Sequence, residues 1–162
     1  MQDPERQQLA VMAEIMRRDL EILAGEVLAM PEEHLWRVTG SVINPVGTLA
    51  LHMCGNLQHF IGAVLGGTGY VRNRDAEFGT RDISRDEILQ KIEETRSMLA
   101  TVLPSLPSDR LTAVMPGIPA RYSGRSVGFF LGHLCSHLAY HLGQVNYLRR
   151  VLAPDGVEDP EV

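Results

Sequence analysis

The sequence predicts an all-α protein, a four-helix bundle with a long proline-rich connector between its third and fourth helices. Apolar side chains recur at steps of three and four residues in four separate stretches, and no stretch shows the strong alternation of a half-buried strand. The length of 162 residues suggests one hydrophobic core. We therefore expect a single bundle domain over residues 1–154 and an acidic C-terminal tail over residues 155–162.

The first two predicted helices begin at capping signals. An aspartate followed by proline and an acidic residue starts the first, which covers residues 3–29 and ends before Pro31. An Asn-Pro pair starts the second, which covers residues 45–65 and ends at a glycine-rich segment. The charged residues 70–81 that follow are expected to form a polar loop.

The third and fourth predicted helices are separated by the longest connection. A serine–glutamate capping box at residues 84–87 starts the third helix, and Pro104 ends it. Residues 104–124 contain four prolines, and this segment is long enough to pack over the bundle or over a site. The fourth helix begins between residues 123 and 126 and continues to Leu152.

Composition argues against several classes of protein. The formal net charge of −5 argues against a dedicated nucleic-acid or membrane-surface binder. No apolar run approaches the roughly 20 residues that span a bilayer, and the N-terminal residues lack the features of a signal peptide. The two cysteines, Cys54 and Cys135, have no metal-binding or redox spacing, so a reduced cytoplasm is the simplest location.

The fourth predicted helix carries three histidines, His133, His137 and His141, at intervals of four residues. This spacing places them on one face of the helix. On a helical wheel His141 lies near the middle of the apolar stripe and His137 inside it, whereas His133 lies near its edge and Arg149 points away. An unpaired buried polar group costs on the order of 1–3 kcal/mol, so these rings need partners, and a metal ion is one candidate.

Helix geometry limits which histidines can share an ion. His137 and His141 are separated by a rise of about 6 Å, but His133 and His141 by about 12 Å, so the pair is His137 with His141 or His133 with His137. The core position of His141 favours the first. A third ligand must come from another helix, where His52 and His59 lie about 10 Å apart along the axis, so only one can be level with the pair.

Carboxylates are nearly absent from the apolar faces of the second and fourth helices, which argues against a di-iron site. The expected centre is three neutral imidazoles with an open position.

Each candidate also has an interpretation without a direct ligand role. The histidine pair can be a hydrogen-bonded feature of the core, and His133 or His59 can border the site. Asn56 and Gln144 face the site side of their helices, where they can position bound water, substrate or a ligand ring, or simply make hydrogen bonds within the core. Both cysteines are expected to be inert core thiols.

Two segments resemble one known family. T-L-A-L-H-M-C-G-N contains His52, and H-L-C-S-H-L-A-Y-H-L-G-Q-V-N-Y-L-R-R contains an H-x-x-x-H-x-G-Q signature. Both resemble the DinB-like superfamily of metal-dependent four-helix bundles. The resemblance follows the helix order of nearly the whole chain, with specific motifs in the second and fourth helices. It implies a divalent metal held by His52, His137 and His141.

The same resemblance supplies the functional expectations. Relatives contain zinc, nickel or iron, some are transferases or isomerases that use low-molecular-weight thiols, and dimers are common. We therefore expect a cytoplasmic homodimer that is a thiol-dependent S-transferase, or another metal-dependent transferase or hydrolase, acting on a small-molecule thiol or electrophile. We expect no nucleic-acid or membrane partner. The alternatives are a non-enzymatic, stress-associated module with a structural metal, and a bundle that dimerises through a helix face without metal.

Overall fold

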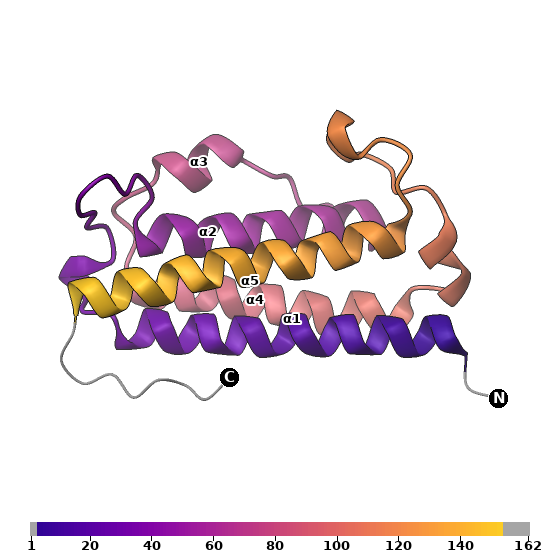
Figure 1. Cartoon of the computed structure of the whole chain (residues 1–162), viewed down its shortest axis with the longest axis horizontal. Helices are drawn as coiled ribbons and strands as arrows, with labels where there is room; N and C mark the ends of the chain where they lie inside the picture. Colours follow the sequence, from indigo (N-terminus) through magenta and orange to yellow (C-terminus); the bar gives the residue numbers. More distant parts are fainter. Residues whose placement is uncertain (1–2, 154–162) are drawn as a thin grey trace.

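The computed structural model describes residues 3–153, and every regular element in that range is helical, which confirms the all-α prediction. Four long helical segments lie side by side (Figure 1): α1 (Pro4–Ala29), α2 (Val46–Leu57) with its continuation η2 (Gln58–Leu65), α4 (Arg85–Ser105) and α5 (Val127–Leu152). Both α1 and α2 pack against α4 and α5, an arrangement compatible with a four-helix bundle. The predicted acidic tail, residues 155–162, lies outside the described residues.

Two of the three predicted capping signals act as N-caps. The Asp3 carboxylate accepts hydrogen bonds from the first backbone N–H groups of α1, and Ser126 also caps α5. Ser84 and Glu87 form a reciprocal capping box at the start of α4. The Asn-Pro signal does not supply a cap, because Pro45 is the N-cap residue of α2 and no side chain caps this helix. The long helices therefore begin within a residue or two of the predicted positions.

The hydrophobic core lies between the four helical segments and contains the apolar stripes seen in the sequence. Its largest fully buried side chains include Met16, Leu20, Leu23, Met53, Leu57, Ile88, Ile92 and Phe130. Burial of such side chains contributes roughly 1.5–3 kcal/mol each, so packing rather than helix propensity holds the segments together. None of the helices within residues 3–153 is long and apolar enough to cross a membrane.

Two elements differ from the prediction. Residues 70–81 were expected to be a loop, but they contain the short helix α3 (Arg74–Gly79), which Asn73 caps and which packs against α2. Six residues are too few to show a helical period, so this helix has no periodic signature in the sequence. The end of the second predicted helix is the π-helix η2, whose wider turn changes the direction of the side chains that follow.

The connector between α4 and α5 is also partly ordered. It contains the 3₁₀-helices η3 (Ser108–Thr112) and η4 (Ala120–Tyr122), and one antiparallel bridge joins Val114 to Ser126. A further 3₁₀-helix, η1 (Glu32–His34), follows α1. Figure 1 shows η4 and α3 on the same side of α2 and α5, with α3 toward one end and η4 toward the other.

The prediction that Arg149 points away from the core was wrong. Its side chain is only 4% exposed and forms a salt bridge with Glu26 of α1, to which Asn146 also donates a hydrogen bond of 2.8 Å. The helical-wheel prediction assumed that α5 buries a single apolar stripe, but α5 also packs against α1 on a neighbouring face. An arginine there is compatible with burial because a carboxylate from the facing helix receives its guanidinium.

Candidate metal centre

Three imidazoles from two helices converge between α2 and α5. His52 Nε2 lies 3.4 Å from His137 Nε2, which in turn lies 3.2 Å from His141 Nε2. The three donor atoms all lie within 4.8 Å of one another. The structure thus brings together the three residues that the sequence and the family resemblance had selected as ligands.

The local fold explains this convergence. His137 and His141 lie one turn apart on α5, with ring centroids separated by 4.5 Å. Packing of α2 against α5 places the His52 ring 5.2 Å from the His137 ring and 5.1 Å from the His141 ring. His52 is buried, whereas His137 and His141 are half-buried, so the centre lies at the margin of the core rather than in its middle.

The outer nitrogens of two rings already have hydrogen-bond acceptors. His52 Nδ1 lies 2.9 Å from Glu77 Oε2, and His141 Nδ1 lies 2.7 Å from Gln144 Oε1. A carboxylate or an amide oxygen accepts hydrogen bonds, so each Nδ1 is the donor and each neutral ring keeps a lone pair on Nε2. Gln144 therefore orients a ring of the cluster.

This tautomer assignment leaves an electrostatic conflict that a cation would remove. The Nε2 lone pairs of His52 and His141 both face His137 Nε2. His137 Nε2 can carry one hydrogen and donate it to only one of them, so at least one lone pair lacks a donor. A divalent cation accepts lone pairs from all three rings at once, so the donor set fits a metal ion.

Glu77, which sequence reasoning missed, anchors the first of these rings. Its carboxylate receives Arg72 Nε at 2.6 Å and Arg72 Nη2 at 2.8 Å, in addition to His52 Nδ1. Burial would raise the pKa of Glu77, but the hydrogen bonds from Arg72 and His52 outweigh it and lower the pKa, so the carboxylate is ionised. A charged acceptor behind His52 fixes the ring and makes Nε2 more basic.

Gly55 allows the Glu77 carboxylate to reach α2. A Cβ at Gly55 would lie 2.7 Å from Glu77 Cδ and closer still to Oε1. This glycine is the signal that could have indicated a close approach, because a glycine inside a helical pattern often marks a packing requirement. The partner was hidden because α3 was predicted to be a loop.

The imidazoles of His137 and His141 are in the protonation state that binds metal. Burial, followed by the neighbouring rings of His141 and His52, lowers the pKa of His137 to about 3. Burial also lowers the pKa of His141, although its hydrogen bond to Gln144 acts in the opposite direction. Both rings are therefore neutral near pH 7, with lone pairs available.

The remaining candidates lie outside the cluster. The His133 ring lies 5.9 Å from the His137 ring and 4.6 Å from Tyr122 of the connector, while His59 packs against Phe60. Asn56 is buried, and its Oδ1 has no hydrogen-bond partner within residues 3–153. His133 thus borders the centre under the connector, and Asn56 offers a free acceptor one turn from His52.

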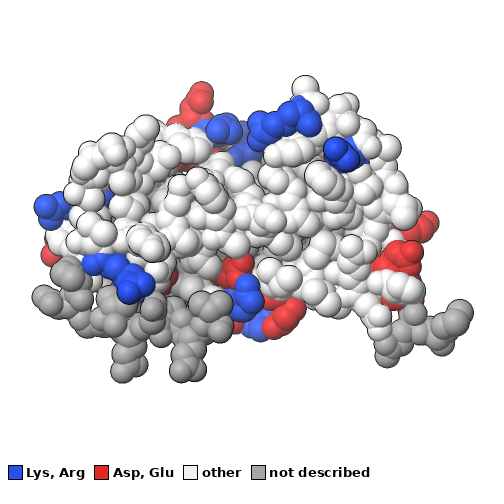
Figure 2. Space-filling view, viewed as in Figure 1, with Lys and Arg blue, Asp and Glu red and all other residues white. Residues whose placement is uncertain are grey.

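Positive charge also borders this side of the molecule. Arg72 contributes to the lowered pKa of His137, after burial and the neighbouring histidines, and Arg121 contributes to the lowered pKa of His133, after burial. Figure 2 shows basic side chains along the edge that carries α3 and the connector, with acidic side chains beside them at the α3 end. An anionic group would therefore be attracted toward this edge.

Comparison with known proteins adds one family. A family model described as "Protein of unknown function (DUF1572)" matches residues 5–158 of the chain. No curated protein matches the chain.

Proposed function

The chain belongs to the DUF1572 family, and we propose that it is a divalent-metal-binding protein in which His52, His137 and His141 are the ligands. The observation that carries this proposal is the convergence of three Nε2 atoms, two of them on rings whose Nδ1 hydrogens are already donated elsewhere. The proposal includes the finer fold assignment, a four-helix bundle of the DinB-like type. Zinc, nickel and iron are the expected ions because imidazole nitrogen suits all three.

The functional part of the proposal is a metal-dependent transferase or hydrolase that acts on a small molecule. A divalent ion at such a centre supplies Lewis acidity, which lowers the pKa of a bound thiol or water near neutral pH. A thiol-dependent S-transferase is the most specific form, and it rests on the family resemblance. The homodimer remains a prediction on the same basis, and the cytoplasmic location remains a prediction from the cysteine spacing.

Two features favour this enzyme over a module with a purely structural metal. Among the His, Cys, Asp and Glu side chains of the described residues, only the three histidines form the cluster, so none of these residue types supplies a fourth ligand. His137 and His141 are also half-buried, which leaves the centre accessible from one side. Catalytic metal sites typically combine three protein ligands with an open position, whereas structural sites have four.

The remaining side chains of the centre have distinct roles in this proposal. Glu77 holds His52, and Gln144 holds His141, in the ring orientations that direct Nε2 toward the ion. Asn56, with its free buried Oδ1, is the candidate to accept a hydrogen bond from bound water or substrate. His133 contributes to the border of the site rather than to the ligand set.

The metal content of single-histidine variants distinguishes the metal ligands from the histidine that only borders the centre. The protein, made in rich medium and purified without added metal, should show about one ion per chain by X-ray fluorescence. His141→Ala should lose this ion, whereas His133→Ala, a matched change one helical turn before His137, should retain it. Absence of metal from the wild type after incubation with zinc, nickel and ferrous salts, or equal loss in both variants, would refute the assignment.

A screen with small thiols addresses the enzymatic part. Binding of a thiol at the centre should raise the melting temperature of the metal-loaded wild type but not of His141→Ala. A thiol that stabilises both proteins equally binds elsewhere, and that result would argue against the S-transferase proposal while leaving the metal site intact.

A further inference from the structure

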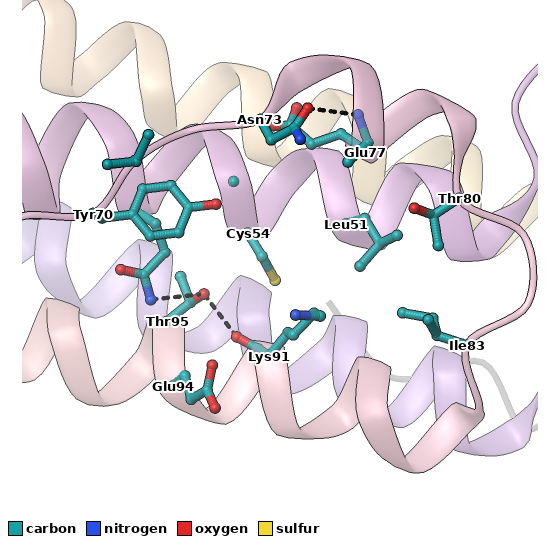
Figure 3. A pocket seen from close by; sticks show the side chains of 14 residues that line it. Leu51, Cys54, Tyr70, Asn73, Glu77, Thr80, Ile83, Lys91, Glu94 and Thr95 are labelled. Atoms are coloured by element: carbon teal, nitrogen blue, oxygen red, sulfur yellow. Dashed lines mark hydrogen bonds between the residues drawn. The ribbon is translucent and has the colours of Figure 1, made fainter.

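A cavity lies between α2, α3 and α4 (Figure 3), and the three clustered histidines are not part of its wall. Its volume is about 380 Å³, enough for a small organic molecule. Leu51 and Ile83 supply apolar wall, and Tyr70, Lys91 and Thr95 supply polar groups. Glu77 is part of the same wall, whereas none of the three clustered histidines lines the cavity.

Lys91 is the only lysine in the chain, and it lies in this wall. Figure 3 shows its side chain extending from α4 into the space below Cys54. No hydrogen bond or ion pair joins its ammonium group to any of residues 3–153. Every other permanently charged cationic side chain of this protein is an arginine, which suits fixed, planar pairing, whereas a lysine ammonium on a flexible stem can turn toward a ligand.

The other charged groups of the wall already have partners. The Glu77 carboxylate is held by Arg72 and His52, and Glu94 accepts a hydrogen bond of 2.9 Å from Gln90. Burial raises the pKa of the Cys54 thiol to about 12, so this group is neutral and does not act as a counter-ion. Within the described wall, Lys91 is therefore the one charged side chain without a hydrogen bond or ion pair, although its charge contributes, after the hydrogen bonds from Ser84, to the lowered pKa of Glu87 one turn before it on α4.

From these observations we infer that the cavity binds a small carboxylic acid, whose carboxylate meets Lys91 and whose apolar body packs along Leu51 and Ile83. A single ammonium group matches a monoanion. A phosphate ester would need more positive charge, because phosphate sites typically combine several cationic or backbone donors. The Tyr70 ring projects into the cavity from the segment before α3, where its hydroxyl is available to a polar substituent (Figure 3).

The chain contains a built-in reporter for occupancy of this cavity. Trp36, the only tryptophan, donates its indole N–H to the backbone oxygen of Ile83 at 3.2 Å. Ile83 lines the cavity, so a ligand that contacts it should change the tryptophan fluorescence. Lys91 supplies a second reporter, because the amine targets of an acetylating reagent in this chain are only this side chain and the N-terminal amine.

The test titrates the full chain with benzoate, benzamide and benzylamine, three molecules of similar shape with negative, zero and positive charge. Benzoate should bind with a Kd of about 1 mM, an affinity expected of so small a ligand, and the other two at least tenfold more weakly. Benzoate should also protect Lys91 from acetylation, as measured by mass spectrometry.

Variants connect the binding to Lys91. Lys91→Gln should weaken benzoate binding about tenfold, the usual effect of losing one charge-assisted hydrogen bond, and leave benzamide binding unchanged. Arg110→Gln removes the same charge from an exposed position on η3 and should have no effect. His141→Ala should still bind benzoate, so failure of the metal proposal and failure of this one can be told apart.

Three results would overturn the inference: no binding of benzoate at about ten times the expected Kd, equal binding of benzoate and benzamide, or unchanged benzoate binding by Lys91→Gln. Lys91 is exposed and forms no hydrogen bond or ion pair with the described residues, so Lys91→Gln is a fair comparison once its melting temperature matches that of the wild type.

Discussion

At the scale of single residues, the centre depends on a glycine that is not itself a ligand. Gly55 leaves room for the Glu77 carboxylate, and Glu77 sets the tautomer and orientation of His52. Hydrogen-bond partners behind metal ligands typically change metal affinity by 10–100-fold. The sequence thus determines the affinity of the centre partly through the absence of a side chain.

Gly55→Ala is therefore expected to weaken metal binding about 10–100-fold and to destabilise the fold by roughly 1–3 kcal/mol, because the new methyl group must displace Glu77. Competition with a chromophoric chelator measures the affinity, and urea unfolding measures the stability. Gly25→Ala is the matched control: it lies on α1 with nothing within 4 Å of a new Cβ. It should gain up to about 1 kcal/mol. Wild-type metal affinity in Gly55→Ala would disprove the role assigned to Glu77.

His137 leads to a prediction for pH. Burial and the adjacent histidines lower its pKa from the ordinary value of 6.5 to about 3, so between these values the unfolded chain binds a proton that the folded, metal-free chain does not. The free energy of unfolding that depends on neutral His137 is therefore fully present above pH 6.5 and is lost as the pH falls toward 3. Thermal unfolding in the presence of a chelator should show a falling melting temperature over that window, with a smaller fall in His137→Gln. Equal slopes for the two proteins would contradict the prediction.

At the scale of elements, the long helices were predictable and the short one was not. In α1, α4 and α5 the apolar spacing of three and four residues repeats over many turns, and a capping residue marks the start of each helix. These features together are enough to predict a helix from the sequence. The helix α3 has six residues and is held by its contact with α2, which is tertiary information. The same difference decides which residues of the metal centre could be predicted. Helical spacing and the family resemblance selected the three histidines, whereas Arg72 and Glu77 lie in the segment that was predicted to be a loop.

The contact between α1 and α5 contains the buried salt bridge between Glu26 and Arg149, which the helical wheel did not predict. Arg149→Met should cost roughly 3–5 kcal/mol, because it leaves the Glu26 carboxylate buried without its cation. Arg17→Met removes an exposed partner of Glu14 and should cost less than about 1 kcal/mol. Urea unfolding compares the two variants, and similar losses would show that the buried pair has no special role in joining the helices.

At the scale of the whole molecule, the ligands join helices that are far apart in the sequence. His52 lies on α2 and the other two on α5, so an ion bound by all three stabilises the folded state and has no preformed site in the unfolded chain. Free metal at about 100 times its Kd should add about 2.7 kcal/mol to the stability.

For a chain of this size, that energy corresponds to a rise in melting temperature of roughly 5–11 °C. Differential scanning calorimetry with metal and then with excess chelator should show the rise and its reversal. His141→Ala should show neither, although it retains the core packing of α1, α2, α4 and α5. An equal metal-dependent shift in this variant would place the ion elsewhere, because binding that does not use His141 cannot occur at the centre where the three Nε2 atoms meet.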